Sequence, residues 1–114
     1  MSKRNLEIFI KDILESIERI ESYTRNKTED EFFDNYEKQD AIMKRLEIIG
    51  EAIKHIPKKF KERYSEIPWK KIAGMRDVLI HEYFGIIMER VWDVAKNDIP
   101  KFKKQISELL KNLE

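Results

Sequence analysis

The chain has 114 residues, of which 41% are hydrophobic and 39% charged, with a net charge of +1. This length predicts a single domain over residues 1–114, with a core of its own. Three glycines and three prolines are too few for the frequent turns of a β-sandwich or barrel, and the absence of cysteine excludes disulfides and thiolate chemistry. No apolar run reaches the roughly 18 residues of a membrane span, and no secretory stretch follows the N-terminus. We therefore expect a soluble, cytoplasmic, all-α protein without a membrane partner.

The first half of the chain predicts three helices. Apolar residues at steps of three and four indicate a helix of roughly 20 residues that ends at Asn26-Lys27; the stripe is Leu6, Ile10, Ile13, Ile17, Ile20 and then Tyr23 or Thr24. Thr28-Glu29-Asp30-Glu31 matches a capping box, so a short helix should follow it. That helix either runs on or breaks near Asn35, which would then cap the third.

The third helix carries a glycine in its interior. Its apolar positions are Ala41, Ile42, Leu46, Ile49, Ala52, Ile53 and Ile56, and Pro57 ends it. Gly50 lies within this pattern, where glycine costs about 1 kcal/mol relative to alanine. We expect the compensation to be the close approach of another helix backbone.

The second half predicts one or two loose turns over 58–64 and then two further helical segments. One runs from about Pro68, near its first helical position, to Phe84, and Gly85 stops it. The other extends from Ile87 to Leu110. Because Pro100 lies within it, this segment is either kinked or two helices that meet near Asn97-Asp98. The architecture is an all-α bundle of four or five helices.

The charges are unevenly distributed along the chain. Residues 15–37 carry eight acids and three bases, a net charge of −5, whereas residues 54–71 carry seven bases and two acids, a net charge of +5. Two interpretations remain open: the basic section contacts a polyanion, or both sections form a solvated, salt-bridged surface.

Only two histidines are present, and they differ in context. His55 ends the third helix among lysines, which suits a capping or solvent role. His81 lies five residues after Arg76 and two before Tyr83. Arginine supplies a permanent cation for phosphate oxygens, and histidine exchanges a proton near neutral pH, so the pair suits metal-independent cleavage of an RNA phosphodiester. A structural role for Arg76, paired with Asp77 or Glu82, remains the alternative.

Helix geometry limits how this site forms. At about 100° per residue, Arg76 and Tyr83 share a face, whereas His81 lies about 140° away from Arg76. Either the helix distorts, the arginine side chain wraps around, or a second copy of the chain completes the site in a two-fold dimer. The carboxylates Asp40, Asp77 and Glu82 show no metal-ligand spacing, and no phosphate-binding glycine loop is present, so we expect no metal or cofactor.

Arg76-x4-His81-x-Tyr83 resembles the Arg-x4-His-x-Tyr motif of the HEPN superfamily, specifically of HepT-like toxins. The resemblance extends over roughly residues 5–112. It includes Gln39–Ile42 with Arg45–Ala52, Pro68–Asp77 with Leu79–Gly85, and Val91-Trp92 with Asn97–Pro100.

This resemblance implies a helical homodimer that acts as a ribonuclease toxin. A minimal nucleotidyltransferase antitoxin would silence it by transferring AMP to the motif tyrosine. By position, Arg76 and His81 would be catalytic, Asp77 supporting and Tyr83 the modified residue. RNA would be the substrate, with tRNA and mRNA as candidate targets, and Lys58, Lys59, Lys61, Lys70 and Lys71 of the basic section would contact its backbone.

A second function from a different class is also open. The chain would then be a non-catalytic helical subunit that holds nucleotide or substrate for a nucleotidyltransferase, and the motif would bind phosphate without cleaving it. An RNA turnover assay separates the two, because binding alone yields no 2′,3′-cyclic phosphate product.

Overall fold

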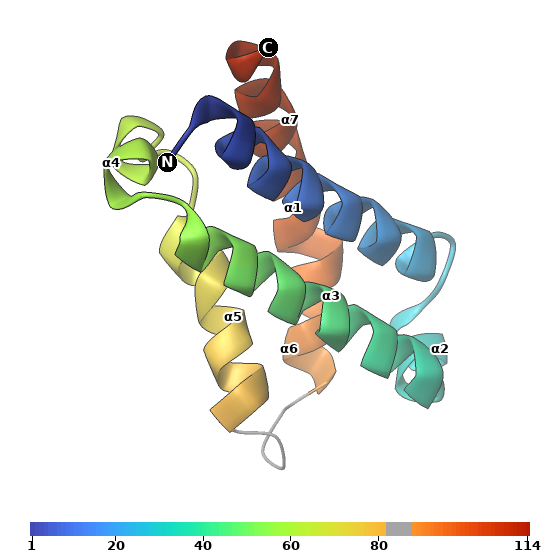
Figure 1. Ribbon diagram of the computed structural model, residues 1–114. Coiled ribbons are helices and arrows are strands. Elements are labelled where there is room, and N and C mark those ends of the chain that lie inside the picture. The colour runs from blue at the N-terminus through green and yellow to red at the C-terminus, as the bar shows by residue number, and fades with distance from the viewer. Residues whose placement is uncertain (82–87) are drawn as a thin grey trace.

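The computed structural model describes residues 1–81 and 88–114, except for the side chains of residues 80 and 81, and these ranges are all-α (Figure 1). The α-helices are α1 (Lys3–Thr24), α2 (Glu29–Phe33), α3 (Tyr36–His55), α4 (Lys58–Arg63), α5 (Trp69–His81), α6 (Met88–Asp93) and α7 (Ile99–Leu113). A π-helical segment, η2 (Val94–Asp98), joins α6 to α7. The predicted all-α bundle is therefore confirmed. None of the described helices is long and apolar enough to cross a lipid bilayer.

The long helices form a bundle around an isoleucine-rich core. Figure 1 shows α1 and α3 antiparallel and side by side, with α5 packed on α3 and α7 packed on α1. The predicted stripe of α1 is buried, and it meets the apolar face of α3. The largest fully buried side chains are Phe102, Ile10, Ile13, Ile17, Ile20, Ile42, Leu46, Ile49, Ile53, Ile72, Ile99 and Ile106.

Side-chain caps define the helix starts in the first half of the chain. Thr28 Oγ1 accepts a hydrogen bond from the Glu31 amide at 3.1 Å, as the capping-box pattern predicted. Helix α2 ends at Phe33 instead of running on into α3. Asn35 Oδ1 accepts a hydrogen bond from the Lys38 amide at 3.0 Å, so Asn35 caps α3. Asn26, with φ of 58°, lies just beyond the end of α1 in the left-handed region that asparagine tolerates.

The three prolines all lie at helix starts, and Pro57 is the N-cap of α4. The Pro68 carbonyl accepts from the Ile72 amide at 3.1 Å, so Pro68 is the N-cap of α5, one position before the predicted one. Pro100 occupies the first turn of α7, immediately after the π-helical turn of η2, in which the Ile99 amide bonds the Val94 carbonyl. Pro100 has no amide hydrogen to donate, and the wider π turn before it changes the register of the helical hydrogen bonds at this point. The helical segment is therefore distorted near Asn97-Asp98, as predicted. The predicted stop at Gly85 lies outside the described residues.

Gly50 lies at the contact between α3 and α5. A Cβ atom on Gly50 would lie 2.5 Å from Cβ of Arg76 and 3.4 Å from the carbonyl oxygen of Ala73. Both atoms belong to the backbone of α5 or are fixed to it, so neither can rotate away. The predicted close approach of a second helix is confirmed, and glycine is the residue that permits it.

We expect Gly50→Ala to destabilise the fold. The added methyl group must separate α3 from α5, at a cost of about 1–3 kcal/mol that exceeds the gain of about 1 kcal/mol in helix propensity. Urea unfolding measures the difference. Gly74→Ala is the matched control, because its Cβ would meet no described atom within 4 Å, and it should instead stabilise the fold by about 1 kcal/mol. A Gly50→Ala protein as stable as the Gly74→Ala protein would contradict the steric explanation.

Candidate active site

Arg76 is anchored on α3. Its Cβ and Cγ pack over Gly50, and its Nε lies 2.8 Å from Oε2 of Glu51, the next residue of α3. Its side chain is 25% exposed, so the guanidinium lies at the rim of the α3–α5 contact rather than in the core. The close helix approach therefore determines where this arginine can reach.

Asp77 connects the same arginine to a lysine of α3. Its Oδ1 accepts hydrogen bonds from Arg76 Nη1 at 3.4 Å and from Lys54 Nζ at 2.9 Å. With Glu51, these residues form two cations and two anions across α3 and α5, which we call the α3–α5 charge cluster (Glu51, Lys54, Arg76 and Asp77). The pairing of Arg76 with Asp77, which the structural alternative for Arg76 predicted, is present. Asp77 thus contacts Arg76, as the supporting role expected for it requires.

The cluster holds Arg76 by two of its three nitrogens. Glu51 pairs with Nε and Asp77 with Nη1, while Nη2 has no hydrogen-bond partner among the described residues. A guanidinium fixed in this way keeps donors available for a further oxygen ligand, and phosphate oxygens match its planar geometry.

His55 lies in the last turn of α3, as predicted, on the other side of Glu51. Its Nε2 is 3.3 Å from Glu51 Oε1, and its ring stacks on Phe9 with centroids 5.4 Å apart and planes 6° from parallel. The side chain is 55% exposed. These contacts agree with the capping or solvent role expected for this histidine.

His81 is the last residue of α5, and its side chain lies outside the described residues, as do Glu82 and Tyr83 altogether. The convergence of Arg76, His81 and Tyr83 therefore stays a prediction. The backbone of α5 does place position 81 in helical register with positions 70, 74 and 77, because these four fall within an arc of about 60° at 100° per residue.

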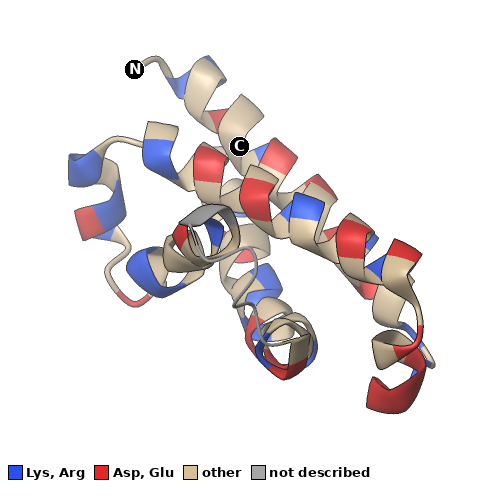
Figure 2. Ribbon diagram, turned by 90° about the horizontal axis from the view of Figure 1, so that it is seen from below, with Lys and Arg blue, Asp and Glu red and all other residues tan. Residues whose placement is uncertain are grey.

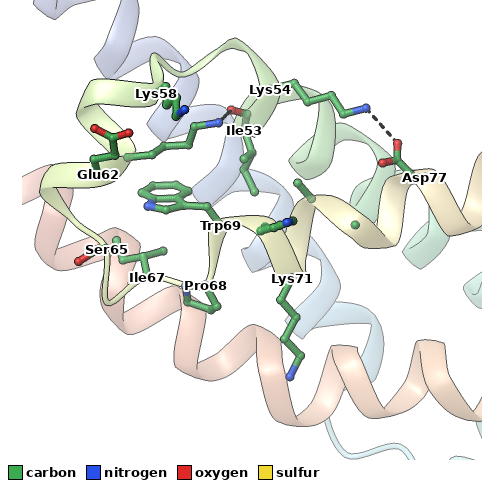
Figure 3. A pocket seen from close by; sticks show the side chains of 14 residues that line it. Ile53, Lys54, Lys58, Glu62, Ser65, Ile67, Pro68, Trp69, Lys71 and Asp77 are labelled. Carbon is green, nitrogen blue, oxygen red and sulfur yellow. Dashed lines mark hydrogen bonds and ion pairs between the residues drawn. The ribbon is translucent and has the colours of Figure 1, made fainter.

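A groove of about 720 Å³ lies along this same side of α5, between the end of α3, α4 and the first turns of α5 (Figure 3). Its apolar surface comes from Ile53, Ile67, Pro68, Trp69, Ala73 and Gly74. Five lysines surround it: Lys54, Lys58, Lys61, Lys70 and Lys71. Glu62 and Asp77 are the acids that line it, so the lining has a net charge of +3. We call it the lysine groove.

Three of these lysines have structural contacts. Lys54 pairs with Asp77, Lys61 Nζ donates to the Ile53 carbonyl at 3.3 Å, and Lys71 Nζ lies 3.2 Å from Asp98 Oδ1. Figure 3 shows Lys54 reaching across to Asp77, and Lys71 extending away from Trp69. Lys58 and Lys70 form no ion pair with the described residues. The groove thus combines fixed cations with two that are available for a ligand.

The groove brings together four of the five lysines predicted to bind RNA. Lys58, Lys61, Lys70 and Lys71 line it, whereas Lys59 is exposed on α4 but is not part of the lining. Lys54 was not among the predicted residues, although it lies one turn after Gly50, on the helix face expected to meet another backbone. Glu51 was likewise missed, and its position next to Gly50 was the available signal.

Among the side chains that the structure describes, those of residues 1–79 and 88–114, no group of three or more His, Cys, Asp or Glu is arranged to hold a metal ion.

Together, the fold and the site define a small all-α protein with an anchored arginine beside a lysine-lined groove. A family model described as Ribonuclease HepT-like matches residues 13–109. The chain belongs to this family, as the motif around His81 predicted.

Relatives from archaea resemble the chain over nearly its whole length. A protein of Methanocaldococcus jannaschii named "Gamma-glutamylcyclotransferase and putative RNase MJ0434" is 50% identical over 98% of this chain, which spans half of that protein's length. "Putative RNase MJ1216" of the same organism is 45% identical, over all of this chain and 94% of the relative. "Probable ribonuclease HepT" of Thermococcus cleftensis is 44% identical, over 96% of this chain and 99% of the relative. No solved structure is significantly similar to the chain.

Proposed function

We propose that this protein is an endoribonuclease that cleaves RNA phosphodiesters without a metal ion, with Arg76 and His81 as its catalytic residues. The observation that carries the proposal is the anchored Arg76, held by Glu51 and Asp77 beside the lysine groove. Membership of the Ribonuclease HepT-like family, and relatives named as RNases, support it.

The chemistry follows from the two side chains. His81 takes the proton from the 2′-hydroxyl or gives one to the departing 5′-oxygen. The 2′-oxygen then attacks phosphorus, the bond from phosphorus to the 5′-oxygen breaks, and the products are a 2′,3′-cyclic phosphate and a 5′-hydroxyl. Arg76 donates to the non-bridging phosphate oxygens, where negative charge increases in the transition state. Asp77 supports this role by holding Arg76 Nη1.

A homodimer completes the proposed site. His81 lies about 140° around α5 from Arg76, so a single straight helix does not aim both at one phosphate. A two-fold axis near the ends of the α5 helices would bring two copies of the motif to one cleft. One histidine would then act as base and the other as acid.

The lysine groove is the proposed contact for the RNA backbone, with tRNA and mRNA as candidate targets. It lies on the side of α5 that is in register with position 81, and its net charge of +3 attracts a polyanion. Lys58, Lys61, Lys70 and Lys71 would contact phosphates from the groove, and Lys59 would do so from the exposed side of α4.

Within a cell, we place this ribonuclease in a toxin–antitoxin pair, with a minimal nucleotidyltransferase as the antitoxin. AMP transferred to Tyr83 would bring a phosphate onto the helix face that the sequence pattern predicts for both Tyr83 and Arg76. That tethered anion would compete with RNA for the guanidinium, so inhibition requires no refolding.

We expect Arg76→Ala and His81→Ala each to reduce RNA cleavage by about 10²–10⁴-fold, the usual effect of losing a general acid or base or an electrostatic stabiliser. The production of 2′,3′-cyclic phosphate ends, measured by gel and mass spectrometry, follows the reaction. Circular dichroism should show unchanged helicity.

The same assay in EDTA tests the metal-free mechanism, because cleavage should persist. Activity that disappears in EDTA and returns with Mg²⁺ would argue against it. RNA binding without any turnover by the unmodified protein would favour the non-catalytic subunit instead.

Charge reversal should separate backbone binding from the chemistry. Lys58→Glu and Lys70→Glu should weaken RNA affinity without changing the bond that is cut. The salt dependence of binding should fall by about one counterion for each phosphate that the protein no longer neutralises. Fluorescence anisotropy at several salt concentrations measures this. Lys27→Glu, in the acidic section, is the control and should bind as the parent does. Equal RNA affinity in all these proteins would show that the basic section is a solvated surface that does not contact RNA.

Incubation with the cognate nucleotidyltransferase and ATP should place AMP on Tyr83, as detected by peptide mass spectrometry, and cleavage should then fall. Tyr83→Phe should escape modification and retain cleavage. Tyr64, half-buried against Phe60 with ring centroids 5.0 Å apart, is the comparison tyrosine. An adduct on Tyr64 in place of Tyr83 would overturn the regulatory assignment while leaving the nuclease proposal intact.

A further inference from the structure

Two glycines interrupt the helices that form the site, and the structure accounts for only one of them. Gly50 is required because Arg76 occupies the space that a side chain would fill. Gly74 lies inside α5, where glycine is unfavourable relative to alanine, yet a Cβ at this position would meet no described atom within 4 Å. Packing within the described chain therefore gives no reason for glycine at position 74.

Gly74 lines the lysine groove. Close approach of a ligand to the backbone is one reason for a glycine inside a helix. Ala73 precedes it on the same lining, so two consecutive small residues leave this part of α5 uncovered. The open space at Gly74 is thus part of the groove.

The rest of the lining indicates the chemistry of the ligand. Pro68 is exposed at the groove, Trp69 and Ile67 form its largely buried floor, and lysines surround them (Figure 3). A ligand that suits both has an apolar, flat part and a negative charge, which describes a nucleotide. A second copy of this chain suits the groove poorly, because two-fold symmetry would bring its own lysines toward these lysines.

The groove also lies at a suitable distance from the proposed chemistry. Asp77, at one end of the groove, precedes His81 by one turn of α5, about 6 Å along the axis. Gly74 precedes His81 by about 10 Å. Asp77 also accepts a hydrogen bond from Arg76 Nη1 at 3.4 Å, so a nucleotide at this end of the groove would be next to a phosphate held by Arg76.

We propose that the lysine groove is a nucleotide subsite, in which Gly74 lets the base and ribose that neighbour the cleaved phosphate pack directly against the backbone of α5. This inference rests on the proposed ribonuclease function for the identity of the polymer. Lys58 and Lys70 hold the phosphate of that nucleotide, while its apolar face packs over the exposed Pro68.

Gly74→Ala tests the subsite, because the substitution should improve the fold and impair the binding. The thermal midpoint should rise by a few degrees, since alanine is the better helix former. The Kd for a fluorescein-labelled, single-stranded 12-mer RNA with 2′-O-methyl riboses, which cannot be cleaved, should increase at least fivefold. Lys70→Gln, on the same stripe of α5, should also raise the Kd and lower its salt dependence.

Asn112→Ala is the matched control, because it changes an exposed position of α7 outside the groove. It should leave the Kd unchanged. A Gly74→Ala protein with parental RNA affinity would overturn the subsite. So would a Gly74→Ala protein whose dimer dissociates in light scattering while its RNA affinity stays the same, because a second copy would then be the occupant.

The non-cleavable probe keeps this test separate from the proposed catalysis. Weaker binding by Gly74→Ala supports the subsite even if the parent protein fails to cleave RNA. Normal cleavage by the parent together with unchanged binding by Gly74→Ala overturns the subsite alone.

Discussion

The close approach of α3 and α5 at Gly50 is the contact on which the candidate site depends. A helix pair separated by ordinary side chains would keep Arg76 farther from α3, and Glu51 would not reach its Nε at 2.8 Å. With glycine at position 50, the α5 backbone lies against α3, and the next turns of both helices come within reach of each other. Lys54 then pairs with Asp77 at 2.9 Å, so one small residue organises four charges.

These charges and the groove lysines have different roles. The α3–α5 charge cluster is balanced, and its exposed ion pairs contribute little to stability. Its effect is directional, because it fixes a guanidinium with some donors still available. The lysine groove, with a net charge of +3, instead provides a field that extends into solvent and decays over about 8 Å at physiological salt. In the proposed function, the groove lysines attract the polyanion and Arg76 orients one phosphate.

The two charged sections of the sequence are also separated in space. Figures 1 and 2 show the acidic α2 at one end of the molecule and the lysines of α4 at the other. A polyanion is therefore attracted to the α4 end and repelled from the α2 end.

Local patterns in the sequence determined the helices and their ends. Apolar spacing, the caps at Thr28 and Asn35, and the prolines each act within a few residues, so their effects are visible without the fold. The Arg76–His81 motif and the basic section were visible for the same reason. Even Gly50 indicated a helix contact, because an interior glycine needs a compensation.

Only the tertiary structure decided which helix meets Gly50 and which charges become partners. Glu51 and Lys54 are more than 20 residues from Arg76 and Asp77 along the chain, and no local rule selects them from the 45 charged residues. The groove likewise forms only where the end of α3, α4 and the start of α5 pack together. This packing places Lys54 in the lining of the groove, whereas Lys59 does not line it. The sequence alone determined the elements and the motif, because these depend on neighbouring residues. The partners of Arg76 and the space at Gly74 depend on how helices distant in sequence pack, so they were decided by the fold.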